Sequence, residues 1–550
     1  MSKWNFADVW ETVAEELPDS PALVNGSHSR TWRELDERAD NVGRWLLGAG
    51  VAEQEKVALY LYNCSEYLEA CFAIYKVGLV PINTNYRYAD DELVYLWQNA
   101  DTVAVVFHGA FVERIEGIRD RLPGVRSWLW VDDGAAICPP WATPFEEATE
   151  TTGFCGPDGH QRVRAPWGRG PDDIHMLYTG GTTGMPKGVM WRQDDLFARL
   201  NGGGFRRYPL EGGIEDVRAE LAANGAGMTL LPACPLMHGT GGFTAMECLS
   251  EGGHVVTLTS RQFDPVELLD TIDARQVNCV VIVGDAFARP ILATLDDHPG
   301  RWDLGSLAAV ISSGVMWSEE TKQALLRHHP DMLLIDTFGS SEALGIGTSV
   351  SSKQGAAKTA RFKLGRDVRV VDSDGRDIEP GSGRTGELAL GGRIPVGYYK
   401  DETKTKAVFR EMDGIRYSVP GDHAEVRDDG SIHLLGRGSV CINTGGEKVY
   451  PEEVEEVVKT FPGVVDAVVV GIPNDRFGEE IIAVVQLTGG APLDSVALDQ
   501  IVDHVKSRLA SYKAPRQVRF VETIGRSPSG KVDYARHRNE TAEWLGVSLG

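Results

Sequence analysis

The first hundred residues alternate between two hydrophobic spacings. Thr31 and Glu34 form a capping-box pattern, in which threonine accepts at the helix N-cap and glutamate follows three residues later. Apolar residues then recur every three or four positions to residue 46, which predicts a helix that ends near Gly48 and Gly50. Apolar runs predict strands at 56–61, 79–82 and 103–107, with helical spacing between them at 66–76 and 91–98. This alternation predicts parallel strands joined by helices.

The same alternation returns in the middle of the chain, so the predicted fold class is α/β. We expect strands near 228–231, 254–258, 278–283, 307–311 and 333–335, and helices near 241–250, 264–274 and 318–328. Two segments interrupt the pattern. Residues 133–171, rich in Gly, Pro and Trp, are expected to form a surface connection. Residues 201–227 combine glycine with charge and are a candidate insertion or lid, and an idle surface loop fits them equally well.

From about residue 365 to 437 the chain changes to short β segments and turns. Asp372–Gly375 and Arg427–Gly430 are turn sequences between runs rich in Val and Ile. These features predict a small barrel-like subdomain or meander attached to the α/β body. Gly381–Gly386 formally matches the dinucleotide-binding glycine pattern, but it follows Pro380 and leads into an expected strand. Because that pattern must follow a strand and open a helix, we interpret the segment as a turn.

The last part of the chain, residues 441–550, reads as a smaller α+β domain. Pro451 stands at an expected helix start, and valines at 454, 457 and 458 make the apolar stripe of that helix. Residues 464–472 and 481–487 have strand patterns, and residues 495–509 have a helical one. We therefore expect a large domain at 1–437 and a second, smaller domain at 441–550.

Composition limits the class of protein. The 550 residues carry a formal net charge of −24, spread along the chain, which argues against a nucleic acid partner and against an anionic membrane surface. The N-terminus lacks an apolar signal-peptide core, and no apolar run is long enough to cross a bilayer. Eight cysteines lack Cys-x-x-Cys spacing and are expected to be buried thiols in a reducing compartment. The expected location is the cytoplasm, and the oligomeric state is left open, with a homodimer compatible with the sequence.

The segment Tyr178-Thr-Gly-Gly-Thr-Thr-Gly-Met-Pro-Lys-Gly-Val189 has the composition of a phosphate-binding loop. Its glycines let backbone N–H groups approach a polyphosphate, and its threonines and Lys187 add donors for phosphate oxygens. The standard nucleotide-triphosphatase loop has Gly-Lys followed by Ser or Thr. Here Lys187 lies between Pro186 and Gly188, which excludes that loop.

Further motifs follow in a characteristic order. They are Ser312-Ser-Gly-Val-Met316, Phe338-Gly-Ser-Ser-Glu342, Tyr417-Ser-Val-Pro-Gly-Asp422, Gly436-Arg437, Gly445-Gly-Glu-Lys-Val-Tyr-Pro-Glu-Glu-Val-Glu455 and Ser527-Pro-Ser-Gly-Lys531. Together with the glycine-rich segment, this series resembles the adenylate-forming superfamily, which includes acyl-CoA synthetases, luciferases and peptide-synthetase adenylation domains. The resemblance covers nearly the whole chain.

The resemblance implies a role for each motif. It places the ATP phosphates at Thr179, Gly180, Gly181, Thr182, Thr183, Gly184 and Lys187. It places the nucleoside at Gly314, Val315, Asp422 and Arg437, and the α-phosphate and Mg²⁺ at Phe338, Gly339, Ser340, Ser341 and Glu342, with Glu342 as the metal ligand. Lys531 is implied to be the catalytic lysine, and Gly445, Gly446 and Glu447 to lie beside the pantetheine thiol of coenzyme A. His238 is implied to lie at the mouth of the acyl pocket, and a packed core histidine is the alternative.

The implied reaction has two steps. A carboxylate attacks the α-phosphorus of ATP, and an acyl-adenylate and pyrophosphate form; the small domain then rotates, and a thiol displaces AMP. The resemblance also implies a hinge at 438–440 and a mobile small domain. Relatives usually have Asp or Lys two residues after Arg437, and this chain has Ser439. We expect a proline at position 439 to slow thioester formation and to leave adenylate formation largely intact.

The acceptor and the acid are less defined. The chain extends about twenty residues beyond Lys531 without a carrier-protein or reductase domain, which favours free coenzyme A as acceptor. Expected pocket segments carry glycines, at 239, 241, 242, 284, 345 and 347, and no evident Arg or Lys, which favours a bulky apolar acid. Several runs, among them Ile-Pro-Val-Gly-Tyr-Tyr-Lys-Asp401, resemble actinobacterial ligases for fatty acids and steroid side-chain carboxylates. The alternatives are an adenylate-forming enzyme with a non-CoA acceptor and a noncatalytic acyl- or nucleotide-binding module.

Overall fold

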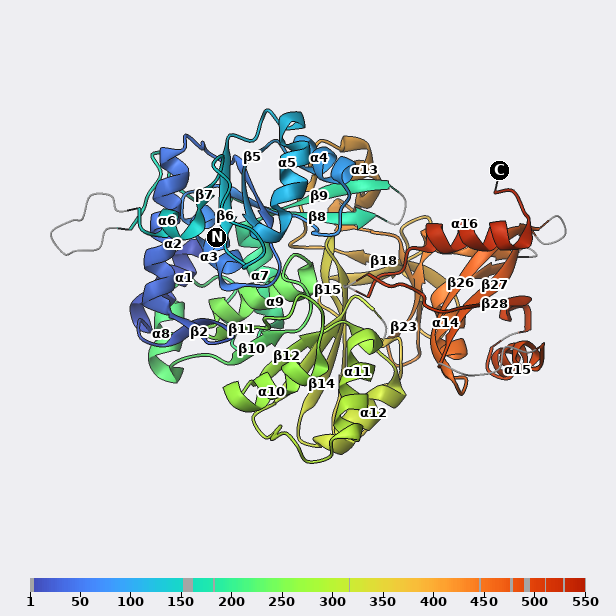
Figure 1. Ribbon diagram of the computed structural model, residues 1–550. Helices are drawn as coiled ribbons and strands as arrows, with labels where there is room; N and C mark the ends of the chain where they lie inside the picture. Colours follow the sequence, from blue (N-terminus) through green and yellow to red (C-terminus); the bar gives the residue numbers. More distant parts are fainter. Residues whose placement is uncertain are drawn as a thin grey trace.

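A computed structural model shows a large body with a smaller domain beside it (Figure 1). It describes residues 4–151, 162–181, 184–315, 317–444, 447–474, 478–488, 495–509, 511–527 and 530–549. Among these residues, no helix combines the length and apolar character needed to cross a bilayer. The described cysteines are free thiols, and most of them are buried, as the sequence predicts.

The first sheet of the large body has eight strands in the order β19-β9-β8-β4-β3-β5-β6-β7. They are β3 (Lys56–Tyr60), β4 (Val80–Asn83), β5 (Thr102–His108), β6 (Ser127–Val131), β7 (Thr143–Pro144), β8 (Ile174–Gly181), β9 (Gly184–Arg192) and β19 (Gly397–Tyr398). Neighbouring strands from β8 through β4, β3, β5 and β6 to β7 are parallel. Helices α4 (Asp90–Asn99) and α5 (Val112–Ile118) pack on one face through a separate apolar cluster. The strands and helices predicted before residue 108 are confirmed to within about two residues.

The second sheet begins in the order β2-β1-β11-β10-β12-β13-β14-β15. Its strands are β1 (Pro21–Asn25), β2 (His28–Thr31), β10 (Thr229–Pro232), β11 (His254–Thr257), β12 (Cys279–Ile282), β13 (Ala309–Ser313), β14 (Leu333–Ser340) and β15 (Ala343–Ser351). The five neighbouring pairs from β1 to β14 are parallel. Helices α10 (Pro265–Arg275), α11 (Gly284–Asp297) and α12 (Glu319–His328) lie along this sheet (Figure 1). The strands predicted here are confirmed.

Helices fill the space between the two sheets. They include α1 (Phe6–Glu16), α2 (Trp32–Gly48), α3 (Ser65–Lys76), α7 (Gln193–Gly203) and α9 (Gly239–Ser250). Helix α3 contacts β1 of one sheet and β3 and β4 of the other. The predicted capping box of α2 is present, with the Thr31 hydroxyl accepting from the Glu34 amide. The buried Lys76 ammonium pairs with three carboxylates on α1 and α2, so its charge is balanced inside the core.

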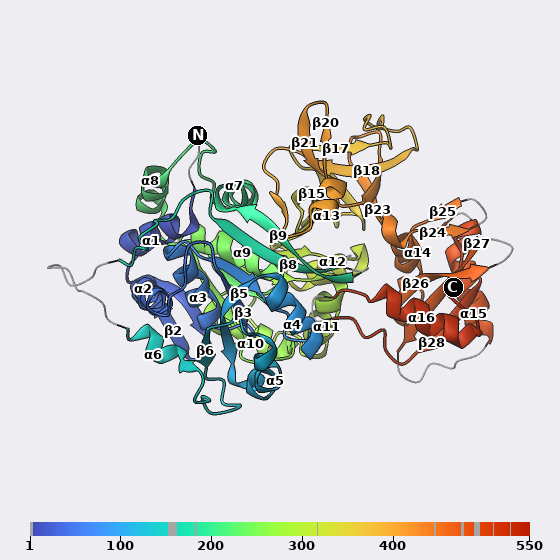
Figure 2. The ribbon, with the colours of Figure 1, turned by 90° about the horizontal axis from the view of Figure 1, so that it is seen from above.

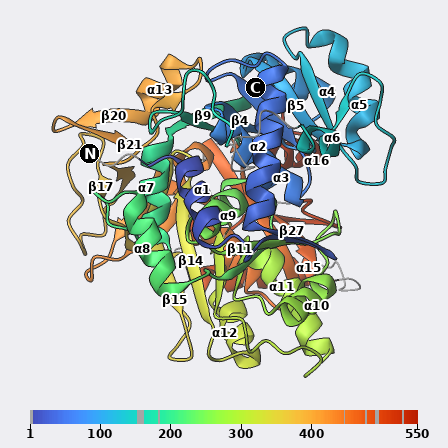
Figure 3. The same cartoon turned by 90° about the vertical axis from the view of Figure 1, so that its left-hand side faces the viewer.

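The segment 201–227 is not a lid. It contains α8 (Ile214–Asn224), which packs on α1 at the side of the body shown in Figure 3. Arg218 of α8 pairs with Glu16 of α1 at 2.7 Å. Arg206 donates to the carbonyl oxygens of Gly225 and Ala226 and ties the loop after α8. The glycine and charge in this segment therefore serve local turns and a helix–helix contact.

The β-rich segment continues the second sheet through β15 and β16. Its strands are β16 (Arg361–Leu364), β17 (Val368–Val371), β18 (Thr385–Leu390), β20 (Phe409–Met412), β21 (Ile415–Ser418), β22 (Asp422–Val426) and β23 (Ile432–Arg437), with α13 (Glu402–Val408) between them. Both predicted turns are present, since Gly375 and Gly430 have positive φ and donate to Asp372 and Arg427. Gly381–Gly386 leads into β18, which confirms that it is a turn. The described strands of this segment pair in the order β16-β23-β22-β18-β21-β20, with β17 on β18, and no pairing among them closes a barrel.

The small domain has its own five-stranded sheet, in the order β25-β24-β27-β26 with β28 on β27. Its elements are β24 (Ile442–Thr444), β25 (Glu447–Val449), α14 (Pro451–Lys459), β26 (Val464–Asn474), β27 (Gly478–Leu487), α15 (Ser495–Lys506), β28 (Gln517–Val521) and α16 (Tyr534–Leu545). Two apolar clusters lie on the two faces of this sheet and are separate from the cores of the large body. The predicted α+β class of this domain is confirmed, and the hinge at 438–440, where a short 3₁₀ turn lies, stays a prediction.

Candidate active site

The predicted site residues follow four parallel strands at the same edge of the second sheet. His238 comes after β10, Gly284 after β12, Gly314 and Val315 after β13, and Glu342 after β14. These strands are neighbours in the order β10-β12-β13-β14, so their carboxyl ends meet. Ligands of open α/β sheets bind at this edge, because loops from several strands converge there.

The glycine-rich segment is the tip of an antiparallel hairpin formed by β8 and β9. Thr179 is paired with Lys187, and Gly181 with Gly184. Thr182 and Thr183 lie outside the described residues. The sequence did not predict this hairpin, because glycine and threonine at such density suggest a loop whereas β8 and β9 extend to its tip. Backbone N–H groups at a hairpin tip that holds glycines at 180, 181 and 184 can be approached closely by an anion.

Glu342 lies at the turn between β14 and β15 and is held by a tyrosine from a distant segment. Tyr398 of β19 donates a hydrogen bond of 2.8 Å to Glu342 Oε1. The Lys187 ammonium lies 5.9 Å from the Tyr398 ring centroid and 3.2 Å from Asp401 Oδ2. Tyr398 thus joins the phosphate hairpin to the carboxylate.

The remainder of the same turn is closely packed. The Phe338 ring lies 5.6 Å from that of Phe362, and a Cβ on Gly339 would lie 2.8 Å from the Ala343 carbonyl oxygen, so this glycine permits the turn. The Ser341 carbonyl oxygen accepts from the Trp191 indole at 2.9 Å. Ser340 Oγ is buried and has no hydrogen-bond partner within the described chain, so it can serve a ligand oxygen.

The predicted nucleoside residues lie on two segments. Gly314 has φ +89°, a conformation that favours glycine, and it turns the chain sharply after β13. Asp422 is 4% exposed at the start of β22, where it is paired in register with Arg437. The prediction that an aspartate and an arginine adjoin one ribose is compatible with this register.

A segment of the small domain reaches into this edge of the large body. Figure 2 shows it extending from the small domain toward α11. Gly530 is buried, and a Cβ on it would lie 2.9 Å from Val315 Cγ2 and 3.1 Å from Val283 Cγ1. Lys531 follows directly. Burial and, to a lesser extent, the nearby Lys531 ammonium lower the pKa of His238 to about 3, so this imidazole is neutral at pH 7.

Of the three residues predicted to meet the pantetheine thiol, Gly445 and Gly446 lie outside the described residues, and Glu447 begins β25. Figure 2 shows β25 on a different side of the small domain from the segment that carries Lys531. One arrangement of the two domains therefore presents only one of these two segments to the large body.

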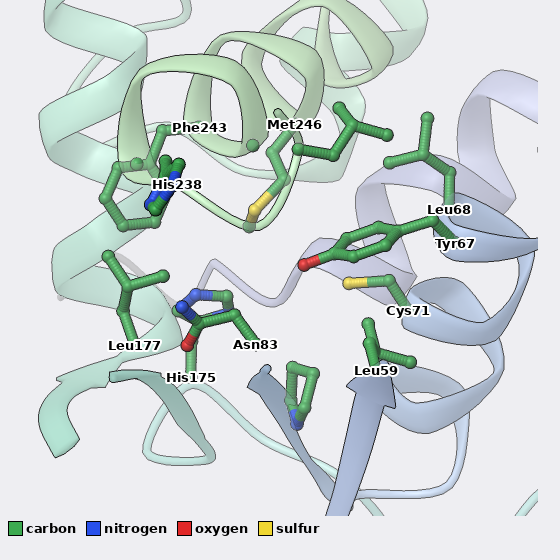
Figure 4. A pocket seen from close by; sticks show the side chains of 14 residues that line it. Leu59, Tyr67, Leu68, Cys71, Asn83, His175, Leu177, His238, Phe243 and Met246 are labelled. Atoms are coloured by element: carbon green, nitrogen blue, oxygen red, sulfur yellow. The ribbon is translucent and has the colours of Figure 1, made fainter. Parts of the chain in front are cut away.

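An apolar pocket adjoins His238. Figure 4 shows its lining side chains, among them Leu59, Leu68, Leu177, Phe243 and Met246, which come from α3, α9 and the strands of the first sheet. Leu236, from the segment after β10, also lines it. No Arg, Lys, Asp or Glu lines it. The cavity measures about 30 Å³, enough for one or two water-sized groups, so a larger ligand requires wall side chains to move.

The glycines expected to leave pocket volume mostly do not. A Cβ on Gly241 would lie 2.6 Å from the Pro235 carbonyl oxygen, and one on Gly242 would lie 2.5 Å from that of Leu236. A Cβ on Gly347 would lie 2.8 Å from Phe362. These glycines permit close backbone packing, which a sequence cannot distinguish from open space. By contrast with Gly241, Gly242 and Gly347, a Cβ on Gly345 would meet no atom of the described residues within 4 Å beyond its chain neighbours, and the φ of this residue is +74°.

Metal ligands are few at this edge. No group of three or more His, Cys, Asp or Glu side chains within the described residues could hold an ion. Glu342 is the one carboxylate that the sequence predicts as a ligand.

Sequence reasoning missed Tyr398, Asp401 and His175, whose contacts join segments far apart in the chain.

Comparisons with known proteins agree with this geometry. The profile of the AMP-binding enzyme family matches residues 10–399, and that of the AMP-binding enzyme C-terminal domain matches residues 453–531. A 3-oxocholest-4-en-26-oate–CoA ligase of Rhodococcus rhodochrous is 40% identical over 549 residues, 98% of this chain and 96% of the relative. A medium/long-chain-fatty-acid–CoA/3-oxocholest-4-en-26-oate–CoA ligase of Mycolicibacterium smegmatis is 38% identical, covering 98% and 97%.

Two solved structures share the fold over their full length. The anthranilate CoA ligase AuaEII in complex with anthranoyl-AMP aligns with a TM-score of 0.82 at 21% identity, covering 99% of this chain and 98% of that one. ATP-bound MatB from Rhodopseudomonas palustris aligns with a TM-score of 0.78 at 25% identity, covering 98% and 100%.

Proposed function

The chain belongs to the AMP-binding enzyme family, and from this premise we propose that it is an ATP-dependent carboxylic acid–CoA ligase that works through an acyl-adenylate. The observation that carries the proposal is the position of Gly530 against Val283 and Val315, with the Lys531 charge close to His238. This contact joins a lysine of the small domain to the predicted adenine turn and the mouth of the apolar pocket. An α-phosphate between an adenosine and an acyl group would lie at that junction.

The first half-reaction joins two anions. A carboxylate oxygen forms a bond to the α-phosphorus of ATP, the bond from that phosphorus to the bridging oxygen breaks, and pyrophosphate leaves. Lys531, Lys187 and the backbone N–H groups of the hairpin stabilise charge on phosphate oxygens, and such donors are typically worth a few kcal/mol each. His238 stays neutral and adds no charge to the acyl side. Asp422 and Arg437 would bind the ribose.

Magnesium fits the donor set beside the hairpin. Mg²⁺ takes one or two carboxylates and completes its shell with phosphate oxygens and water, and Glu342 supplies one carboxylate held in place by Tyr398. When bound, the ion would neutralise phosphate charge. Glu342 is the residue that would hold it.

The second half-reaction requires the small domain to move. The Lys531 segment occupies the site in this arrangement, and β25 with Glu447 lies elsewhere on the small domain (Figure 2). Rotation at 438–440 would withdraw Lys531 and present residues 445–447 to the acyl-adenylate. The thiol sulfur of coenzyme A then bonds to the carbonyl carbon, the bond to the phosphate oxygen breaks, and AMP leaves.

The acid is proposed to be apolar, of the medium- or long-chain fatty or bulky steroid side-chain type. The pocket lacks charged walls, which disfavours a dicarboxylate. The two most similar relatives above are named for such acids.

A screen of acids of graded size tests the function. We expect acid-dependent exchange of labelled pyrophosphate into ATP, followed by CoA-dependent release of AMP, with fatty or steroid acids ahead of acetate and succinate. Exchange without CoA-dependent AMP release would indicate a non-CoA acceptor. Exchange with none of these acids would contradict the proposal and favour a noncatalytic binding module.

A further inference from the structure

One histidine in the wall of the apolar pocket has an unused polar atom. His175 lies in β8, is 7% exposed and lines the cavity together with Leu177 and Phe243. Its Nδ1 lies 2.6 Å from the Tyr75 hydroxyl. Its Nε2 is buried and has no hydrogen-bond partner in the part of the chain that the structure describes. Buried polar atoms are normally paired, so this one calls for an explanation.

The Tyr75 contact determines which nitrogen carries the proton. Apart from His175, the hydrogen-bond acceptors near the Tyr75 hydroxyl are Met246 Sδ at 3.9 Å and the Cys71 thiol, and sulfur is a weak acceptor. The hydroxyl therefore donates to Nδ1, which leaves the hydrogen on Nε2. Burial lowers the pKa of His175 to about 3, so the ring is neutral at pH 7. Tyr75, which is not part of the cavity wall, occupies Nδ1, and the His175 ring lines the cavity, so the Nε2–H is the ring group left for a ligand.

The neighbouring polar groups do not satisfy this N–H. Asn83, which also lines the cavity, donates to the carbonyl oxygens of Tyr178 and Met237 and accepts from the Tyr178 amide. The Phe243 ring lies 5.6 Å from the His175 ring. Figure 4 shows the Tyr67 hydroxyl, a further polar group, turned into the same space from α3. Apart from Asn83, the polar side chains in this wall are His175, His238 at the mouth, the Cys71 thiol and the Tyr67 hydroxyl, which can donate or accept.

We infer that His175 is a specificity-determining residue, whose Nε2–H donates a hydrogen bond to an oxygen carried within the acyl part of the acid. The inference rests on the proposed function and narrows its substrate class to acids with a keto, ether or hydroxyl oxygen in the chain. An acyl chain that places only CH₂ groups beside Nε2 leaves this buried donor unpaired, whereas a chain oxygen at that position accepts its hydrogen bond. The carboxylate itself is placed elsewhere, beside Lys531 and His238.

An oxygen scan along one acid tests the inference. Decanoate is compared with analogues in which one CH₂ after another is replaced by an ether oxygen, which accepts hydrogen bonds and donates none. We expect kcat/KM for CoA thioester formation to peak at one position, roughly tenfold or more above the neighbouring analogues. A profile without such a peak overturns the inference.

Variants assign the peak to His175. In His175→Leu, the kcat/KM of the peak analogue divided by that of decanoate should fall to the value of this ratio for the other analogues. His175→Gln, which keeps an N–H donor, should restore part of the ratio. Tyr75→Phe removes the donor that fixes the tautomer and should reduce the ratio less than His175→Leu. A ratio unchanged in His175→Leu would overturn the inference. If one of the two His175 variants fails to fold, the other assigns the peak, because the wild-type scan alone does not distinguish His175 from the Tyr67 hydroxyl.

The scan separates this inference from the proposed function. Ligation of decanoate with a flat oxygen profile overturns only the role of His175. Absence of CoA-dependent AMP release with every acid overturns both.

Discussion

At the scale of single residues, Tyr398 fixes the carboxylate that is proposed to hold magnesium. Its hydroxyl donates to Glu342 at 2.8 Å, and its ring lies under the Lys187 ammonium. It belongs to β19, a two-residue strand paired with β9 of the phosphate hairpin, so the hairpin and the carboxylate share one support. Tyr398 is therefore a positioning residue.

We expect Tyr398→Phe to lower kcat for adenylate formation roughly tenfold, because a hydrogen bond to a charged carboxylate is worth about 1.5–3 kcal/mol. It should also raise the Mg²⁺ concentration needed for half-maximal rate, which a titration measures. Tyr399→Phe is the matched control, since the neighbouring hydroxyl binds Asp101 at 2.7 Å at the surface. Equal effects of both substitutions would contradict the role of Tyr398.

Site residues within short motifs could be predicted from the sequence, and residues that support them could not. Glu342, Asp422 and Lys531 occur in local patterns with characteristic neighbours. Tyr398 reaches Glu342 across 56 positions, and His175 meets Tyr75 across 100. No local pattern records such pairs, because they depend on how the sheet brings distant strands together.

At the scale of elements, the segment before Lys531 is shaped by glycine. Gly530 has φ +71° and is in close contact with Val315 and Val283. The contact between the two domains thus lies at a backbone conformation that residues other than glycine rarely adopt. The shape of this segment matters for docking as much as the lysine does.

We expect Gly530→Ala to slow adenylate formation roughly tenfold or more, since left-handed backbone costs an L-residue about 1–2 kcal/mol and the new methyl group meets Val315. Thioester formation from supplied acyl-adenylate should change little. Gly525→Ala is the control, because Gly525 also has positive φ (+64°) but its Cβ would face Arg536 within the small domain. If Gly530→Ala lost both half-reactions while Gly525→Ala lost neither, the result would argue against this docking role.

Most helices and strands of the large body could be predicted from hydrophobic spacing, and the elements that could not have physical reasons. The β8–β9 hairpin carries glycines that suggest a loop, yet pairing of the strands continues to its tip. Helix α11 contains Pro290 and begins at Gly284, two residues that disfavour a helix by pattern alone. Helix α8 lies in a segment whose glycines and charges suggest a loop, and its buried residues are Val217 and Leu221.

At the scale of the whole molecule, the two domains meet through buried charge as well as through Gly530. Arg289 of α11 donates to the Val465 carbonyl oxygen at 2.9 Å. Glu456 of α14 faces Asp285 and Lys322 of the large body and Lys459 and Glu455 of its own helix; burial raises its pKa to about 8, with Asp285 and Glu455 adding to the rise. Withdrawal of the small domain would expose this carboxylate to water.

This contact predicts a pH dependence. The docked arrangement holds a proton on Glu456 up to about pH 8, whereas an exposed carboxylate titrates near its ordinary value of 4.5. Docking therefore weakens as the pH rises from 4.5 to 8, by up to about tenfold per pH unit for one proton, and levels off above pH 8, where the carboxylate is charged in both arrangements. Adenylate formation by the wild type should fall between pH 6 and 8 relative to Glu456→Gln, which carries no charge at any pH. Parallel profiles of the two proteins from pH 6 to 9 would contradict this.

The hinge prediction belongs to the same scale. Ser439 lies in the 3₁₀ turn Gly438–Val440, between β23 of the large body and β24 of the small domain. We expect Ser439→Pro to slow thioester formation at least several-fold and to leave pyrophosphate exchange largely intact, because proline restricts the rotation of the backbone. Equal loss in both half-reactions would place the hinge elsewhere.

The central claim is that Lys531 of the small domain acts at a site built by the large body. The most direct measurement is acid-dependent exchange of labelled pyrophosphate into ATP, compared between the wild type, Lys531→Ala and Lys506→Ala, a lysine exposed on α15. We expect Lys531→Ala to lower exchange roughly 10²–10³-fold, while Lys506→Ala and the conversion of supplied acyl-adenylate to thioester stay near wild type. Exchange at the wild-type rate in Lys531→Ala would contradict the account.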